Sequence, residues 1–372
     1  MSCKCKNIMN VLEGIAPASL AEEWDNTGLI VGDPENDISR VLVTLDVDLD
    51  VVREAIGRKA QMIVSHHPVL FHSVKKLDFS DPEMQVIREL VRNDICLYAA
   101  HTNLDAAKGG VNDCLAHALG LKDISVLRKT RHDALMKLVV YVPADHMQTV
   151  IDALFAHGAG QTGAYSRCSF ISEGTGTFLP EEGTHPYTGK TGDWTHVREA
   201  RVETIIPASR ADEAVAAMRE KHPYEEPAYD LFPIQGSNPF EGMGRIGRLE
   251  PCMGLRDFCT LVKSRLDAGH VVTFSNDNST VKTVAVCGGS GADLIGAAAE
   301  RGADVLVTGD MKHHDWLHAK ALGINVVDAG HYYTERVVVR PLIEHLHRSL
   351  NTLEYTVEIV ESNIDTGSTY IY

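Results

Sequence analysis

The chain has 372 residues, of which 44% are hydrophobic and 23% charged, so it is long enough for two or three globular domains. Its formal net charge of −16 argues against tight binding to a nucleic-acid backbone, which depends on clustered Lys and Arg side chains. No window approaches the roughly 18 uninterrupted apolar residues of a membrane-spanning helix, and the N-terminus lacks the features of a secretory signal. We therefore expect a cytoplasmic protein that binds neither nucleic acid nor membranes.

The eight cysteines are scattered along the chain and do not form the regular spacing of a disulfide framework. Cys3 and Cys5 are close enough to bind a soft metal, but no second pair of cysteines accompanies them. We therefore expect these two residues to belong to an exposed N-terminal tail.

Strand and helix signals alternate over the first 120 residues. In chain order they predict a strand at 41–45, a helix at 50–57, a strand at 62–65, a helix at 82–91, a strand at 95–100 and a helix at 110–119. Strands that alternate with helices are typical of βαβ units and a mainly parallel sheet.

The pattern changes in the middle of the chain. It predicts a strand at 138–142, a helix at 145–157, a strand at 199–206, a helix at 209–221 and an extended segment at 229–233, with a long hairpin or excursion at 174–192. This order predicts an inserted ferredoxin-like α+β domain at 130–245. Residues 1–129 and 246–372 would then form a discontinuous α/β outer domain.

The last third returns to the pattern of the first. It predicts strands at 284–287, 304–308 and 324–328, each followed by a helix, the last of which runs from His331 to about residue 348. The matching order predicts an internal duplication, with a chance similarity of ordinary βαβ patterns as the alternative. The expected fold class is thus α/β, with a duplicated βαβ outer domain of mainly parallel sheets and the inserted α+β domain.

Histidine and carboxylate residues follow three of the predicted strands. They are His66 and His67 after the strand at 62–65, Asp105 after that at 95–100, and His331 and Glu335 after that at 324–328. Because ligands collect beyond the carboxyl ends of strands in open α/β sheets, we expect these five side chains to converge. Each motif alone is weak, since a His and a Glu four residues apart often lie on a solvated helix face.

Three imidazoles and two carboxylates suit Zn²⁺, Mn²⁺, Fe²⁺ or Co²⁺. Five ligands are too many for one tetrahedral catalytic ion with an open position, but two ions can share them and leave room for a bridging water. We therefore predict two divalent ions per subunit and hydrolytic chemistry. His101 precedes Asp105 as His331 precedes Glu335, so it is a candidate ligand, proton shuttle or hydrogen-bond donor to a ligand.

Four further motifs have both a functional and a structural interpretation. Asp310 and His314 follow the strand at 304–308 and are candidates to line the cavity, with a helix-capping role as the alternative. The segment Gly288–Gly291 is first a tight turn and second an anion site, because it lacks the Lys-Ser/Thr of a P-loop. The segment at 24–29 is a capped turn or a cavity wall, and the two prolines in 222–227 favour a rigid structural loop.

Several motifs together resemble the dinuclear-metal-centre hexameric proteins called Nif-three-like or GTP cyclohydrolase I type 2. The matching segments are Trp24-Asp-Asn-Thr-Gly-Leu29, Ser65-His-His-Pro68, His101-Thr-Asn-Leu-Asp105, Thr308-Gly-Asp310 with His314, and Gly330-His331 with Glu335. The ligand pattern of that family falls on the same five residues, and His101 lies outside its usual ligand set. The C-terminal segment at 365–372 departs from the Asn-Pro-Phe-like ending of many members.

The resemblance implies a toroidal homohexamer whose metal sites face an internal cavity. It also implies that the middle domain is similar to PII and Cut-A proteins, whose characteristic loop matches 222–227. The implied activity is ring opening of GTP, in which a metal-activated water attacks C8 of the purine, His101 relays protons and basic groups hold the triphosphate. The sequence contains no dedicated guanine or triphosphate motif. The alternative is a non-enzymatic, metal-loaded ring that regulates or binds partners.

Overall fold

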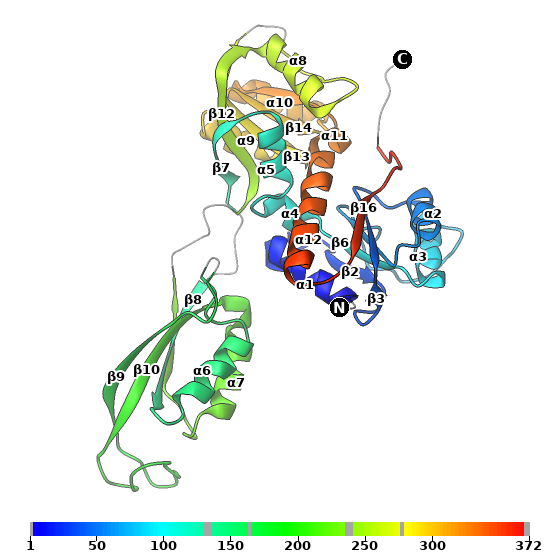
Figure 1. Cartoon of the computed structure of the whole chain (residues 1–372). Coiled ribbons are helices and arrows are strands. Elements are labelled where there is room, and N and C mark those ends of the chain that lie inside the picture. Colours follow the sequence, from blue (N-terminus) through cyan, green and yellow to red (C-terminus); the bar gives the residue numbers. More distant parts are fainter. Residues whose placement is uncertain (1–2, 130–134, 163–164, 235–240, 276–278, 368–372) are drawn as a thin grey trace. The chain divides into compact units, whose positions relative to one another are not determined.

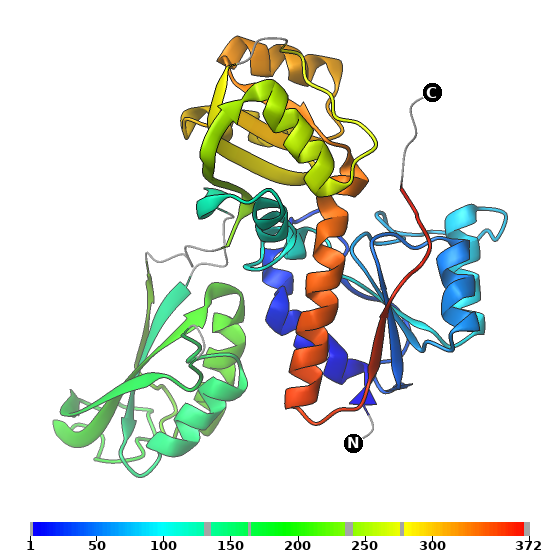
Figure 2. The ribbon, with the colours of Figure 1, turned by 45° about the horizontal axis from the view of Figure 1, so that its top comes forward.

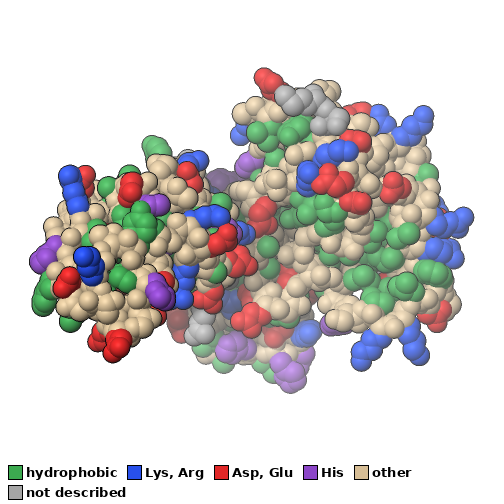
Figure 3. All heavy atoms as spheres, turned by 90° about the horizontal axis from the view of Figure 1, so that it is seen from below, with side chains coloured by type: hydrophobic (Ala, Val, Ile, Leu, Met, Phe, Trp, Pro, Cys, Tyr) green, Lys and Arg blue, Asp and Glu red, His purple; other side chains and the backbone are tan. Residues whose placement is uncertain are grey.

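The structure is a computed structural model that describes residues 3–129, 135–162, 165–234, 241–275 and 279–367. The chain forms two compact units, one made of Met1–Thr130 with Pro239–Tyr372 and the other of Arg131–Asn238 (Figure 1). Among the described residues, no helix is long and apolar enough to cross a membrane. On the face in Figure 3, Lys and Arg side chains are interspersed with Asp and Glu side chains.

The first sheet of the larger unit has five strands in the order β16-β4-β5-β6-β2. They are β2 (Gly28–Val31), β4 (Arg40–Thr44), β5 (Met62–Ser65), β6 (Cys96–Ala99) and β16 (Glu358–Glu361). Neighbouring strands from β16 to β6 are parallel, and only β2 is antiparallel to its neighbour. The sheet therefore combines strands from the two ends of the chain.

Helices cover both faces of this sheet (Figures 1 and 2). The helices are α1 (Cys5–Ile15) and α12 (Val339–Thr352) on one face, and α2 (Leu49–Gly57) and α3 (Pro82–Arg92) on the other. Val41 and Val43 pack with α1 and α12, whereas Leu42 packs with α2 and α3. Because successive side chains of a strand point to opposite faces, burial on both faces requires the continuous apolar run that predicted β4.

The second sheet has the order β15-β14-β13-β12-β7. Its strands are β7 (Lys122–Arg128), β12 (Met243–Gly254), β13 (Thr280–Ser290), β14 (Val305–Gly309) and β15 (Asn325–Asp328). The last three are parallel, and β12 is antiparallel to both β13 and β7. Residues 243–245 therefore belong to this sheet, although the sequence boundary at 245 assigned them to the inserted domain.

The helices of the second sheet also form two layers. They are α5 (Val111–Ala118) and α8 (Leu255–Leu266) on one face, and α9 (Ile295–Glu300) and α10 (His313–Leu322) on the other. The three parallel strands β13, β14 and β15 follow one another through helices, as do β4, β5 and β6 in the first sheet. Both sheets thus carry the same order of elements, and the predicted mixed α/β class with mainly parallel sheets is confirmed for this unit.

Short elements complete the larger unit. They are the strands β1 (Cys3–Lys4) and β3 (Asp37–Ile38), the helices α4 (Thr102–Ala106) and α11 (His331–Glu335), and single 3₁₀ turns at Ala18–Leu20, Ala292–Leu294 and Arg336–Val338. The prediction of an exposed N-terminal tail is wrong, because Cys3 and Cys5 are 2% and 0% exposed. Cys3 pairs with Ile38, and Cys5 begins a helix that packs into the core.

The smaller unit is a four-stranded antiparallel sheet in the order β11-β8-β10-β9, with two helices packed on it. In chain order its elements are β8 (Leu135–Pro143), α6 (Met147–Ala156), β9 (Ser169–Phe178), β10 (Thr195–Pro207), α7 (Ala208–Lys221) and β11 (Tyr229–Pro233). His222 is buried and its Nε2 lies 2.9 Å from the carbonyl oxygen of Tyr141. This contact agrees with the structural role predicted for the loop at 222–227.

A buried arginine joins the second sheet to the helices that follow β6. Arg245, in β12, is 1% exposed, and its Nε donates to Asp113 of α5 at 2.6 Å. Its remaining guanidinium nitrogens donate to Asp113 and to the carbonyl oxygens of Gly242, Gly244 and Ala107. Ala107 directly follows α4, so this one side chain fixes α4 and α5 against β12.

We expect Arg245→Met to lower the free energy of unfolding by about 3–5 kcal/mol, because it leaves the Asp113 carboxylate and three carbonyl groups without their cationic donor. Arg248→Met is the matched control, since Arg248 lies in the same strand and is exposed, and it should change stability by about 0.5 kcal/mol or less. Urea unfolding of both variants measures the difference. Equal losses in the two variants would contradict the structural role of Arg245.

Candidate metal centre

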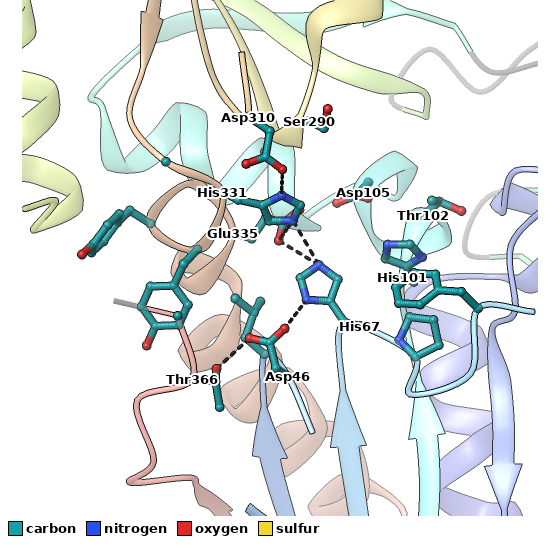
Figure 4. A pocket seen from close by; sticks show the side chains of 18 of the residues that line it. Asp46, His67, His101, Thr102, Asp105, Ser290, Asp310, His331, Glu335 and Thr366 are labelled. Carbon is teal, nitrogen blue, oxygen red and sulfur yellow. Dashed lines mark hydrogen bonds and ion pairs between the residues drawn. The ribbon is translucent and has the colours of Figure 1, made fainter. Parts of the chain in front are cut away.

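The five predicted ligands lie at the carboxyl ends of strands from both sheets of the larger unit. Figure 4 shows four of them, His67, Asp105, His331 and Glu335. His66 and His67 directly follow β5, and Asp105 lies in α4, which is separated from the end of β6 by two residues. His331 and Glu335 lie in α11, beyond the end of β15. His101 precedes α4 and faces the same centre.

The ligand atoms of these residues form three overlapping groups, within each of which all atoms lie within 4.8 Å of one another. The groups are His66 with His67 and His101, His67 with His331 and Glu335, and His66 with Asp105 and Glu335. Overlap of this kind, rather than a single ring of donors, is what two neighbouring binding positions require.

Glu335 is the residue that links the two sheets at this centre. Its Oε1 lies 3.6 Å from His66 Nε2, and its Oε2 lies 3.1 Å from His67 Nε2 and 3.0 Å from His331 Nε2. The side chain is almost fully buried. One carboxylate therefore contacts two imidazoles from the first sheet and one from its own helix.

Every imidazole of the centre uses its Nδ1 atom for a hydrogen bond away from the centre. The partners are Asp46 Oδ1 for His67 at 2.7 Å, Asp25 Oδ1 for His101 at 2.7 Å, Asp310 Oδ2 for His331 at 2.6 Å, and the carbonyl oxygen of Ala100 for His66 at 2.8 Å. An acceptor at Nδ1 places the proton there and leaves Nε2 free to bind a cation. In all four imidazoles, the hydrogen bond at Nδ1 thus makes Nε2 the atom available to bind a cation.

Two of these aspartates were missed in the sequence. Asp46 follows β4, so the strand-end argument that found His66 also applies to it. It was not predicted because no histidine lies next to it in the sequence. Asp25 lies in the segment at 24–29, where no strand was predicted to place it.

Asp310 contacts His331, whereas His314 is exposed and is not among the described residues that line the cavity. The cavity role predicted for His314 is therefore not supported; its ring lies 5.5 Å from that of His313, its neighbour in α10.

Several buried polar atoms of the centre have no hydrogen-bond partner. Among the described side chains these include His66 Nε2, Asp105 Oδ1 and Glu335 Oε2. Glu335 Oε2 is close to two imidazoles, but these contacts have the distance of an ion pair without the angles of a hydrogen bond. His67 Nε2 and His331 Nε2 face each other at 3.2 Å. Buried polar atoms without partners are rare in proteins, and here they are the atoms that a metal ion would satisfy.

The charges at the centre favour cations. Burial raises the pKa of Asp105 to about 6. Burial would also raise the pKa of Glu335, but the charge of His66 and the contacts with His331 and His67 hold it well below its usual value. Burial would lower the pKa of His67, yet its hydrogen bond to Asp46 and its contact with the Glu335 carboxylate raise it to about 10. The carboxylates thus hold protons on the imidazoles, and metal ions would replace these protons.

The glycine segment Gly288–Gly291 makes room for Glu335 instead of binding an anion. A Cβ atom on Gly289, whose φ is +62°, would lie 2.2 Å from Glu335 Oε1. The backbone N–H groups of Gly288, Gly289 and Gly291 donate to the side chains of Asn112, Thr334 and Thr308. Because these three donors are already used, the contacts favour the tight turn over the anion site.

The centre opens into a cavity of about 1640 Å³ in the larger unit. His67, His101, His331 and Glu335 line it, together with Trp24. The cavity is large enough for a small organic ligand.

Comparisons with known proteins agree with the motifs and the fold. A family model described as Duf34/NIF3 (NGG1p interacting factor 3) matches residues 3–367. The chain belongs to this family. The resemblance indicated by the sequence motifs is therefore confirmed, and the candidate metal centre described above lies within the matched part of the Duf34/NIF3 chain.

The relatives cover nearly the whole chain. Proteins of Halalkalibacterium halodurans and Bacillus subtilis, each named GTP cyclohydrolase 1 type 2 homolog, are 42% identical over 361 and 362 residues, with 97% of both chains covered in each case. A crystal structure of a Bacillus cereus protein related to NIF3 has a TM-score of 0.83 and 40% identity, and it covers 100% of both chains.

We expect Gly289→Ala to lower the free energy of unfolding by about 1–3 kcal/mol more than Gly302→Ala, because only the former forces a methyl group against Glu335. Gly302 is a matched control with a φ of +72° and no atom within 4 Å of an added Cβ, so it carries the left-handed backbone strain alone. Thermal unfolding of both variants gives the comparison. Similar losses would show that Gly289 is needed only for its backbone conformation.

Proposed function

We propose that this Duf34/NIF3 protein is a dinuclear-metal-dependent hydrolase. The observation that carries the proposal is the set of buried, unpartnered donor atoms on His66, Asp105 and Glu335, beside two imidazole Nε2 atoms that face each other. An apolar or hydrogen-bonded core would not leave these atoms unsatisfied. The buried imidazole and carboxylate clusters fit divalent ions in both donor type and position.

The donor groups divide naturally between two positions. His66, Asp105 and Glu335 would hold one ion, and His67, His331 and Glu335 the other. Glu335 serves both because Oε1 faces His66 while Oε2 faces His67 and His331. The mixture of imidazole and carboxylate suits Zn²⁺, Mn²⁺, Fe²⁺ or Co²⁺.

When bound, such ions would lower the pKa of a nearby water and polarise the bond under attack. The protein contributes orientation, because Asp46 and Asp310 fix the rings of His67 and His331. It also contributes a proton-transfer group: His101 lines the cavity, and Asp25 accepts a hydrogen bond from its Nδ1 at 2.7 Å. An aspartate at Nδ1 keeps Nε2 available to take a proton at the cavity side.

The relatives' names suggest a purine substrate, since they refer to GTP cyclohydrolase. The corresponding reaction is attack of water on C8 of the purine ring, with His101 moving the proton.

The resemblance to the family also implies an oligomer: we propose a homohexamer whose metal centres face an internal cavity. The interspersed charges in Figure 3 and the net charge of −16 support the absence of a nucleic-acid partner.

We further propose that the smaller unit is a ferredoxin-like domain similar to PII and Cut-A proteins. Its support is the βαββαβ order of elements and the strand order β11-β8-β10-β9. The two helices α6 and α7 pack on one face of the sheet, as this class requires.

Elemental analysis of gently purified protein tests the metal centre. We expect about two divalent ions per chain in the wild type and a loss of at least one in His66→Ala and Glu335→Ala, because each removes a donor from a buried group. His314→Ala is the matched control, since this exposed histidine lies in the same unit and away from the centre. Unchanged metal content in both ligand variants would refute the assignment of ligands.

Turnover of GTP and guanosine by protein loaded with Mn, Zn, Fe or Co tests the hydrolase. We expect ring opening in the wild type, and His101→Gln should retain its metal while losing about 10²–10⁴-fold in kcat, because only proton transfer is removed. Loss of an ion from His101→Gln would make His101 a ligand instead. No turnover with any loaded metal would refute the hydrolase and favour the regulatory or partner-binding ring.

A further inference from the structure

Two exposed aromatic side chains flank His101 at the cavity. The ring of Trp24 lies 6.0 Å from that of His101 at an angle of 74°, and the ring of Phe71 lies 5.7 Å from it at 83°. Both side chains line the cavity, yet they are 63% and 44% exposed. Both pairs are T-shaped, and the exposure of Trp24 and Phe71 shows that much of each ring surface is uncovered.

Polar contacts hold both aromatic residues in position. Asn26 Nδ2 donates to the carbonyl oxygen of Leu70 at 2.7 Å, which ties the segment of Trp24 to the segment of Phe71. Asp25 accepts hydrogen bonds from His101 and from the backbone N–H of Thr102. These bonds hold the residues that follow Trp24 and the residue that precedes Phe71. Core packing does not explain their position, because the rings themselves remain exposed.

The rest of the cavity is acidic. Beyond the four carboxylates that contact the imidazoles of the centre, seven carboxylates and three cationic side chains line it. The carboxylates are those of Glu22, Asp48, Asp50, Glu83, Asp293, Asp315 and Asp328, and the cations are Arg53, Arg128 and Lys312. Both arginines are paired with cavity carboxylates, Arg53 with Asp50 and Arg128 with Asp293.

This charge distribution opposes a polyphosphate. Binding of phosphate groups normally depends on several Arg or Lys side chains that converge on the oxygens. Divalent ions at the centre would offset the carboxylates of the centre, but they would leave the excess of negative charge on the remaining walls. Exposed aromatic rings, in contrast, bind any planar heterocycle by stacking, whatever its charge.

We infer that the cavity binds a planar heteroaromatic ring that carries no polyphosphate, a nucleobase or nucleoside, with Trp24 and Phe71 as the residues that recognise the ring. This inference rests on the proposed function, because the ring would be placed beside His101 and the metal centre for attack by water. The proposed substrate class is thus defined by its ring: the site would recognise the base that GTP carries, but not the triphosphate.

Tryptophan fluorescence of the full-length, metal-loaded protein tests the inference. The chain has three tryptophans, so a Trp194→Phe/Trp316→Phe background leaves Trp24 as the reporter. Guanosine, GTP and inorganic tripolyphosphate are titrated separately. We expect guanosine to quench the emission of Trp24 and to bind about tenfold or more tightly than GTP, with a smaller difference at high salt concentration because salt screens the repulsion.

The aromatic residues are tested by competition with a fluorescent guanosine analogue. Trp24→Leu and Phe71→Leu should each weaken its binding by about tenfold or more while metal content stays unchanged, since stacking is lost while an apolar side chain is kept. Leu77→Ala is the control, because Leu77 is 65% exposed near Phe71 in the chain and does not line the described cavity. Its affinity should equal that of the wild type.

The failures of the inference and of the proposed function are distinguishable. Tighter binding of GTP than of guanosine, displacement of the analogue by tripolyphosphate, or undiminished binding in both leucine variants would each overturn the inference. Absence of binding of guanosine and of GTP to metal-loaded protein would overturn it as well. Absence of metal or of turnover, with ring binding intact, would overturn the hydrolase and leave the ring site standing.

Discussion

The buried carboxylate of Glu335 is the constraint on which the rest of the larger unit depends. A charged group that is only 3% exposed costs several kcal/mol to remove from water unless its surroundings compensate it. Compensation comes from His66 and His67 of the first sheet and from His331 of the second. The two sheets must therefore present their carboxyl ends to the same point, and the glycine pair at 288–289 must leave room for the side chain.

This constraint also explains why three of the four histidines, His67, His101 and His331, have an aspartate at Nδ1, while His66 has the carbonyl oxygen of Ala100. The centre can bind cations only if each Nε2 is unprotonated and points inward, and the acceptor at Nδ1 determines both properties. Asp46 lies beyond the end of β4, Asp310 beyond the end of β14, and Asp25 in the segment that precedes β2. Neighbouring strand ends thus supply both the ligands and the groups that orient them, so the site is built on rigid elements rather than on long loops.

The sequence predicted those parts of the centre that depend on local pattern. Continuous apolar runs located β4, β5, β6, β14 and β15, and the rule that parallel strands share their carboxyl ends brought five ligands together. Contacts between distant segments were not predictable from pattern. Nothing in 122–128 or 358–361 indicates that β7 joins the second sheet and β16 the first. Cys3 and Cys5 were misplaced for the same reason, because their burial depends on pairing with β3 and packing by α12.

Charge connects the centre to the choice of ligand. The acidic walls that attract divalent cations to a buried site also repel an anion that approaches the same site, since both effects arise from one electrostatic potential. A polyphosphate would need basic groups to overcome that potential, and the arginines of the cavity are already paired with Asp50 and Asp293. Aromatic rings provide affinity without charge. An acidic cavity with Trp24 and Phe71 beside His101, the proposed proton-transfer group, is therefore suited to select a substrate by its ring, and the proposed metal ions would supply the chemistry.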